Sequence, residues 1–275
     1  MTNDARSMAL QIEAALQERF GEQVPVPPDL PGLDEVLRIA SHATHRQWAQ
    51  TPVSEELRRL LAACALSAPS KSDLQQADIV EVRDPARRQA LADLVPQLPW
   101  FNSAPLILVF CGDGSRFRRL FERAQEPFTN EHLDGLFNPA VDAALVLMNY
   151  LRAASAVGLV GCPISVLRDR APEVASILEL PRHVFPVAGL CVGYPAARRS
   201  PVPRLGLAAT YHIDRIGPAV SDQLVDAYDT RRLQAEERFG RTDPVPWSQA
   251  KRHQYAQPQR ADWSAFLRKQ GFKTE

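Results

Sequence analysis

Residues 138–157, NPAVDAALVLMNYLRAASAV, form the stretch that most limits how this chain can fold. Asn138 suits a helix cap, Pro139 suits the first helical position, and Gly158 suits a left-handed end to the helix. The predicted helix is apolar on almost every side. Such a helix is stable inside a core or a subunit interface rather than on a wet surface, so the fold must be built around it.

Apolar runs typical of strands surround this helix in the sequence. The run PVAGLCVGY at residues 186–194 is apolar enough for the middle of a sheet. The periodicity predicts strands at 78–83, 105–111, 158–164, 186–194 and 207–213, with helices at 32–43, 53–66, 85–94 and from Pro172 onward. With the helices at 4–20 and 138–157 included, the six predicted helices outnumber the five predicted strands.

The two ends of the chain lack strand signals. Met8, Ile12, Leu16 and Phe20 give residues 4–20 the stripe of an amphipathic helix, and the proline-rich stretch VPVPPDLPG follows it. We therefore predict an appendage at 1–31, a core domain at 32–217 and a helical extension at 218–275 that packs on the body or on a partner. The role of the first helix is open, and one hypothesis is that it clasps a neighbouring subunit.

The composition argues against several classes of function. The 32 basic and 32 acidic side chains cancel, so no overall charge attracts nucleic acid or a membrane. No apolar run is long enough to span a bilayer, and no leader pattern opens the sequence. The four cysteines and six histidines are scattered without metal-ligand spacing. We expect a cytoplasmic protein with reduced cysteines and no bound metal.

Two polar segments carry the chemistry. His42, Thr44 and Arg46 follow a predicted helix at alternate positions, and such donors are suited to binding one phosphate group. A second segment, APSKSDLQ at residues 68–75, supplies hydroxyls, an ammonium and an amide from a loop. The order of helix, polar loop and strand indicates the rim of a ligand site.

These two segments resemble the opening of the bacterial nitroreductase family, where an HRSxR-like anion clamp precedes a loop that reads roughly APSSxNxQ. The resemblance continues in PLILVFCGD, in residues 138–164, in LPRHVFPVAGLCVGYPA, in PVPRLGL and in FLRKQGF. The motif FLRKQGF is similar to the C-terminal end of the proteins in the NADPH-preferring, oxygen-insensitive branch of the family. The order and spacing of these motifs over residues 33–275 make the set specific.

The resemblance implies an α+β fold, in which helices flank a central, mostly antiparallel sheet and a long helix lies at a homodimer interface. It implies noncovalent FMN, which passes two electrons from NADPH or NADH to a small acceptor such as a nitroaromatic or a quinone by a ping-pong mechanism. No catalytic side chain follows from it. His42, Ala43, Thr44, Arg46 and Arg204 would surround the FMN phosphate.

The resemblance also places residues near the flavin ring. Ser70, Lys71, Ser72, Asp73 and Gln75 would approach the ring, partly from the other subunit. Gln97 would bond its pyrimidine edge, and Ile164 and Ser165 would lie beside it.

Several positions depart from the family pattern. Ala43 stands where an arginine is usual, and Val202 where a lysine is common, so two charges directed at the phosphate are missing. Each lost contact is expected to weaken FMN binding by about one or two powers of ten. Ser165 and Val166 replace a glycine pair. Asp73 replaces an asparagine, and a carboxylate near the ring should lower the flavin reduction potential.

These departures keep two alternatives open. The first is a specialised flavin oxidase or dehydrogenase of a metabolic pathway, and the second is a related scaffold with weakened or lost FMN binding. Other signals are weak: CGDGSRF lacks the third glycine of a dinucleotide fingerprint, no GxSxG elbow is present, and acidic residues balance the basic tail.

Overall fold

The computed structural model describes residues 3–197, 199–218 and 220–274, and the chain divides into two compact units. The first unit is Met1–Ala43 with Arg199–Gln259, and the second is Thr44–Arg198 with Arg260–Glu275. These boundaries differ from the predicted ones at residues 31 and 217. The three-part division therefore stays a prediction about how the chain is organised.

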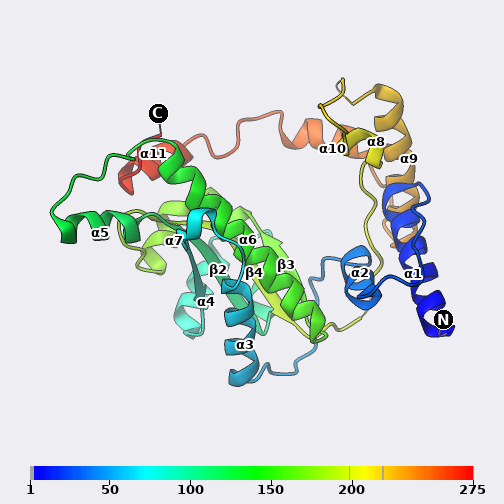
Figure 1. Cartoon of the computed structure of the whole chain (residues 1–275), viewed down its shortest axis with the longest axis horizontal. Coiled ribbons are helices and arrows are strands. Elements are labelled where there is room, and N and C mark those ends of the chain that lie inside the picture. The colour runs from blue at the N-terminus through cyan, green and yellow to red at the C-terminus, as the bar shows by residue number, and fades with distance from the viewer. Residues whose placement is uncertain (1–2, 198, 219, 275) are drawn as a thin grey trace. The chain divides into compact units, whose positions relative to one another are not determined.

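The second unit contains a four-stranded antiparallel sheet (Figure 1). Its strands are β1 (Ala77–Glu81), β2 (Leu106–Asp113), β3 (Val160–Ile164) and β4 (Val184–Gly193), in the order β1-β2-β4-β3. Every neighbouring pair is antiparallel. The predicted α+β class with an antiparallel sheet is confirmed, and the central position expected for the run at 186–194 is confirmed by β4.

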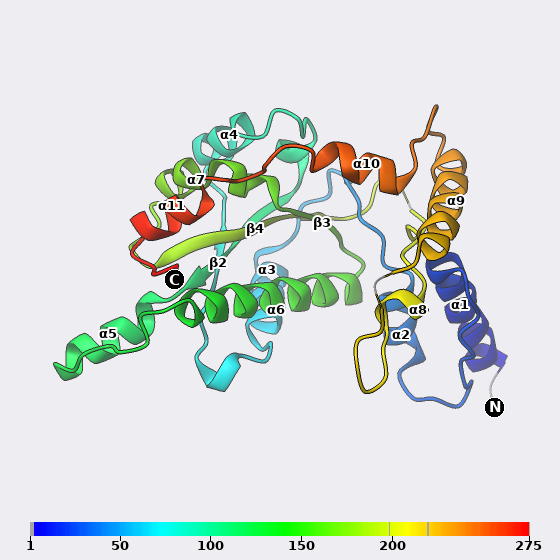
Figure 2. The same ribbon diagram turned by 90° about the horizontal axis from the view of Figure 1, so that it is seen from above.

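Helices cover both faces of this sheet because β2 alternates between two apolar cores. Its even-numbered residues face α3 (Glu55–Leu66) and α6 (Asp134–Ala156), whereas the odd-numbered ones face α4 (Pro85–Asp93) and α7 (Ala171–Ile177). Figure 2 shows these helices on opposite sides of the strands. A strand buried on both faces reads as a continuous apolar run, as PLILVF does.

The long helix α6 begins at Asp134, earlier than predicted. Asn138 is not its cap, because its side-chain amide donates to Asp134 within the helix at 3.0 Å. Pro139 therefore lies inside the helix rather than at its first position. The predicted end is confirmed, since Gly158 has a φ of 81° just beyond the helix.

The remaining elements of the second unit extend this core. Helix α5 (Ser115–Ala124) follows β2 directly and was not predicted from the sequence. Short 3-10 turns lie at Lys71–Asp73, Phe101–Ser103 and Val166–Arg170. Helix α11 (Trp263–Lys269) packs Phe266 and Leu267 on Phe185, so the end of the chain returns to the body of this unit. Three of the four cysteines are buried, but Cys64 is exposed.

The described part of the first unit is helical. It contains α1 (Asn3–Phe20), α2 (Leu33–Ala40), α8 (Leu207–Thr210), α9 (Asp222–Arg238) and α10 (Trp247–Gln254). Ile12 of α1 is fully buried and packs with Leu33 and Ala40 of α2. Met8 and Leu16 of the same stripe are only partly buried against this cluster, so a contact of α1 with a neighbouring subunit stays a hypothesis.

The predicted strand at 207–213 is wrong. Leu207–Thr210 forms one turn of helix instead, and the Leu207 amide donates to the Glu22 carboxylate at 2.6 Å. All the described strands belong to the other unit. A strand pattern without a partner strand cannot form a ladder, and a side chain remote in the sequence accepts from this backbone instead.

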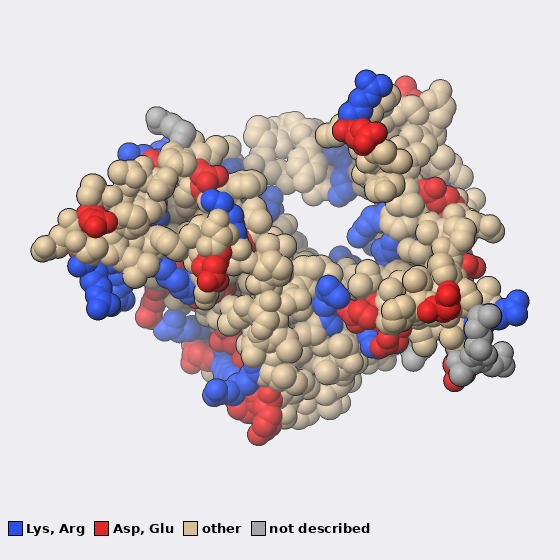
Figure 3. All heavy atoms as spheres, viewed as in Figure 1, with Lys and Arg blue, Asp and Glu red and all other residues tan. Residues whose placement is uncertain are grey.

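Acidic and basic side chains are mixed over the face seen in Figure 3, as expected from the zero net charge. Within the described ranges, no helix combines the length and the apolarity needed to cross a bilayer.

Candidate functional site

One buried carboxylate ties down the polar loop at residues 70–76. Asp142 lies on the mostly apolar α6, and it is 1% exposed. It accepts hydrogen bonds from Ser70 Oγ at 2.6 Å, from the Lys71 amide at 3.1 Å and from the Gln76 amide at 3.0 Å. A buried carboxylate is tolerated when several donors satisfy it. Asp142 therefore fixes both ends of the loop to α6.

The backbone of this loop is strained. Ser72, Asp73 and Gln75 have φ values of 51°, 58° and 51°, in the left-handed region that side chains other than glycine rarely adopt. Each such residue costs on the order of 1 kcal/mol and persists only where its surroundings impose it. The Asp142 contacts provide that restraint. Strain of this kind is concentrated at ligand sites.

Arg116 of α5 holds the other side of the loop. Its guanidinium donates to the Gln75 carbonyl at 2.6 Å, forms an ion pair with Asp78, and lies 3.4 Å from the Asp113 carboxylate. The pKa of Asp78 is raised, first by burial and then by the neighbouring Asp113, while Arg116 opposes the rise. One cation thus links the loop to two carboxylates at the sheet edge.

A cavity of about 600 Å³ opens beside this loop. Its walls include Ser70, Asp73, Gln75, Arg116 and Asp142. The volume lies within the range of small-molecule sites, roughly 300–1,000 Å³. Lys71, Ser72, Asp73 and Gln75 are exposed, so the predicted ring-contacting side chains are accessible to a ligand.

The segment at residues 44–48 lies along the sheet in the same unit. Trp48 forms a β-bridge with Pro195, just after β4. Arg46 is exposed, and its guanidinium lies 5.9 Å from the centre of the Trp100 ring. Thr44 is half-buried. Aromatic stacking of this kind restrains a long side chain while leaving its donors accessible.

The other predicted phosphate ligands belong to the first unit. Arg19 of α1 connects their segments: its Nη2 donates to the His42 carbonyl at 2.5 Å, and its own carbonyl accepts from the Arg204 amide at 2.7 Å. Ala43 is buried next to His42. The Arg204 side chain is exposed, and no described residue forms a hydrogen bond or an ion pair with it.

The last three predicted residues lie at two places in the second unit. Ile164 is buried at the end of β3 and pairs with Gly189 of β4. Ser165 is exposed directly after it, and its carbonyl accepts from Arg260 at 3.4 Å. Gln97 is exposed in the turn between α4 and the following 3-10 turn.

The structure brings the predicted ring contacts from Ser70 to Gln75 together in one loop, whereas the predicted phosphate contacts are divided between the units. Sequence reasoning missed Asp142, Arg116 and Arg19. Asp142 had a signal, because it is the one acidic residue inside the apolar run 138–157. Arg19 had none, since its side chain donates to backbone carbonyls far away in the sequence, and Arg116 had none because its contacts with Gln75 and Asp78 join residues remote in the sequence.

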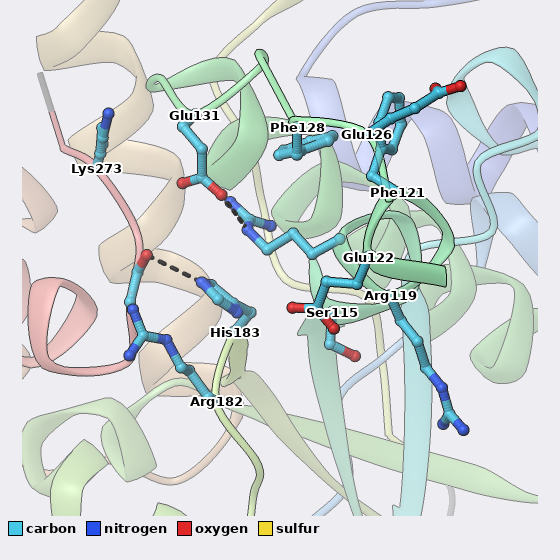
Figure 4. A pocket seen from close by; sticks show the side chains of 12 residues that line it. Ser115, Arg119, Phe121, Glu122, Glu126, Phe128, Glu131, Arg182, His183 and Lys273 are labelled. Atoms are coloured by element: carbon cyan, nitrogen blue, oxygen red, sulfur yellow. Dashed lines mark hydrogen bonds and ion pairs between the residues drawn. The ribbon is translucent and has the colours of Figure 1, made fainter. Parts of the chain in front are cut away.

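A second cavity, of about 810 Å³, lies beside α5 and the end of the chain (Figure 4). Arg118 is paired there with Glu131 at 2.5 Å, and His183 contacts the Gly271 carbonyl at 3.1 Å. The pKa of His183 is lowered by burial and by the nearby cations Arg118 and Arg182. None of the predicted site residues lines this cavity.

The chain is similar to known proteins. The chain matches the nitroreductase family over residues 39–194 and the nitroreductase family C-terminal domain over residues 203–275. An FMN reductase [NAD(P)H] of Bacillus subtilis is 32% identical over 251 residues, which cover 88% of this chain and all of that protein. An oxygen-insensitive NADPH nitroreductase of Salmonella typhimurium is 31% identical over 237 residues, or 86% of this chain and 97% of that one.

A solved structure of Bacillus megaterium NfrA2 has the same fold. It superimposes with a TM-score of 0.83 at 32% identity and covers 88% of this chain and 99% of its own. The predicted fold is confirmed by this likeness as well as by the sheet. The two family matches cover most of the sequence, and the chain belongs to the nitroreductase family.

Proposed function

We propose that this chain works in the cytoplasm as a homodimer and passes two electrons from NADPH or NADH to a nitroaromatic, a quinone or a similar small acceptor. That it is an FMN-dependent NAD(P)H oxidoreductase follows from its family and from relatives named FMN reductase and NADPH nitroreductase. We propose in addition the class of acceptor, the residues that hold FMN and the homodimeric assembly. The observation that carries it is the restrained polar loop beside a ligand-sized cavity.

The residues present are compatible with FMN. Arg204 presents an exposed guanidinium without a described partner, which suits a phosphate. The loop at 70–76 presents exposed hydroxyl, ammonium and amide groups on a fixed backbone, which suits the polar edge of a flat ring. A bound FMN would supply two-electron redox chemistry at these residues, between a reduced nicotinamide and a second substrate.

We assign the phosphate to His42, Thr44, Arg46 and Arg204, with Ala43 contributing backbone only. Planar guanidiniums form paired, charge-assisted hydrogen bonds with phosphate oxygens. Two arginines and an imidazole still provide a clamp, although the cations usual at positions 43 and 202 are absent. We therefore expect weaker FMN binding than in relatives that keep both.

We assign the ring to Ser70, Lys71, Ser72, Asp73 and Gln75, with Gln97, Ile164 and Ser165 as further contacts. These side chains orient two successive substrates and need supply no acid or base. The Asp73 carboxylate accepts from Gln75 Nε2 at 3.0 Å, so its charge is held on the loop. Asp73→Asn should raise the flavin reduction potential, which a potentiometric titration measures. An unchanged potential would place Asp73 away from the ring.

An exposed apolar stripe on α6 supports the homodimer. Phe137, Val141, Leu145 and Met148 recur on one side of this helix and are 62%, 36%, 40% and 45% exposed. A contiguous apolar stripe on a surface marks an interface. Light scattering of the purified chain should give twice the monomer mass, and a monomer at micromolar concentration would contradict this assembly.

The function is tested with the purified full-length chain. It should carry the visible absorbance of oxidised flavin, lose it anaerobically on addition of NADPH, and regain it when a nitroaromatic or a quinone is added. A colourless chain that cannot be reconstituted with FMN would favour the scaffold alternative. Rapid reoxidation by oxygen without turnover of nitro compounds would favour the specialised oxidase.

A further inference from the structure

The last turn of α1 contacts both segments of the first unit that carry predicted phosphate ligands. Arg19 Nη2 donates to the carbonyls of Ala40 at 3.1 Å and His42 at 2.5 Å, and Nε also reaches Ala40 at 3.2 Å. Its Nη1 donates to the Val202 carbonyl at 3.4 Å. One guanidinium therefore bridges residues 40–42 and residue 202, which are remote in the sequence.

The main chain of Arg19 adds a second bridge. The Arg204 amide donates to the Arg19 carbonyl at 2.7 Å. Arg231 of α9 donates to the same carbonyl at 3.3 Å and to the Arg204 carbonyl at 3.0 Å. Gly21 ends α1 with a φ of 77°, and a Cβ there would meet the Arg231 guanidinium at 2.6 Å. The absence of a side chain at Gly21 therefore leaves room for the Arg231 guanidinium beside the end of α1.

The charges around Arg19 favour an anion. Burial lowers the pKa of Arg19 first, and the nearby positive charge of Arg204 lowers it further, against the opposing effect of Glu18. Arg204 has no anionic partner among the described residues. Arg19 is half-buried and Arg204 is exposed, so water screens their repulsion only in part, and a phosphate would relieve what remains.

We propose that Arg19 is a positioning residue for the flavin phosphate, which holds the His42 and Arg204 segments at a fixed separation through hydrogen bonds to their backbones. This inference rests on the proposed function. Helix α1 lies outside both family matches, which begin at residues 39 and 203. In this chain the N-terminal helix thus provides a preorganising brace, at a clamp that lacks cations at positions 43 and 202.

The test compares two ligands that differ only in the phosphate. Flavin fluorescence titrations of the flavin-free full-length chain measure the dissociation constants of FMN and of riboflavin. Arg19→Ala should raise the dissociation constant of FMN about tenfold or more, and should change that of riboflavin less than twofold, because only FMN has a phosphate to bind at the clamp. Arg19→Lys keeps the charge but loses the planar set of donors, so it should show the same selective loss to a smaller degree.

Two controls separate this role from a loss of folding. Ile12→Ala removes a buried side chain from the same helix, and should lower the melting temperature without changing the ratio of the two dissociation constants. Arg6→Ala removes an exposed cation of α1 and should change neither. Should Arg19→Ala fail to fold, the Arg19→Lys comparison decides.

Three results would overturn the inference. The first is that the wild type and Arg19→Lys bind FMN with equal affinity. The second is that the Arg19 variants lose affinity for FMN and for riboflavin to the same extent. The third is that Ile12→Ala shows the same selective loss of FMN affinity. A wild-type chain that binds neither flavin would overturn the proposed function itself, and with it this inference. That outcome is distinct, because it appears before any variant is made.

Discussion

The loop at residues 70–76 and the segments around His42 and Arg204 are fixed by residues of opposite charge. A buried carboxylate, Asp142, accepts from amides and a hydroxyl of the loop. A half-buried guanidinium, Arg19, donates to carbonyls of the other segments. In both regions the anchor satisfies backbone groups and leaves the side chains of Lys71 and Arg204 exposed. Each anchor is therefore distinct from the groups proposed to touch the ligand.

The two anchors, Asp142 and Arg19, differ in how far water can replace their hydrogen bonds when the side chain is removed. Asp142 is 1% exposed, whereas Arg19 is half-buried, so water can replace more of the contacts of Arg19. The carboxylate should therefore matter more for stability. The guanidinium should matter more for ligand selectivity.

The largest expected effect comes from Asp142→Ala. It leaves the Ser70 hydroxyl and the Lys71 and Gln76 amides without their acceptor, and should lower the free energy of unfolding by about 3 kcal/mol. Urea denaturation of the variant and of Asp93→Asn, an exposed helical carboxylate, measures the difference. A loss under about 1 kcal/mol would mean that the loop is held by other contacts.

A smaller effect is expected from Arg116→Met, and it should depend on pH. The variant leaves Asp78 beside Asp113 without their shared cation, so the pKa of Asp78, already raised by burial, rises further. A carboxyl whose pKa is higher in the folded than in the unfolded state destabilises the fold above that pKa, and the penalty disappears as the pH falls through it.

The deficit of Arg116→Met should thus be greatest at neutral pH, on the order of 1 kcal/mol for these partly exposed groups, and shrink on acidification. Thermal melts over a pH series, with Arg119→Met on the same helix as the control, measure it. A deficit that stays constant with pH would show that Asp78 does not titrate in response to Arg116.

The smallest effect concerns the strain in the loop. Ser72 has a φ of 51°, so Ser72→Gly should relieve strain and raise the free energy of unfolding by about 0.5 kcal/mol after the entropy cost of glycine. Ser67→Gly, at an ordinary φ of −79° after α3, should instead lower it. Calorimetry of both variants checks the signs, and destabilisation by both would argue against strain at Ser72.

The cores and most elements could be predicted from sequence periodicity. The alternation of β2 and the apolar α6 are visible in the residues themselves, because burial on a sheet face or around a helix selects side chains at a fixed period. The polar segments at 42–46 and 68–75 were also identifiable, and their contacts with FMN stay predictions. The strand predicted at 207–213 failed because its apolar pattern carries no information about whether a partner strand is present.

Only the tertiary structure revealed Asp142, Arg116 and Arg19 as anchors. Their partners are mostly backbone amides and carbonyls, which every residue possesses, so no side-chain pattern distinguishes the position that will be bound. The sequence by itself determined the nitroreductase fold and the polar groups offered to a ligand. The folded chain decided how those groups are held, because a hydrogen bond between remote backbone and side chain depends on distance rather than on residue order.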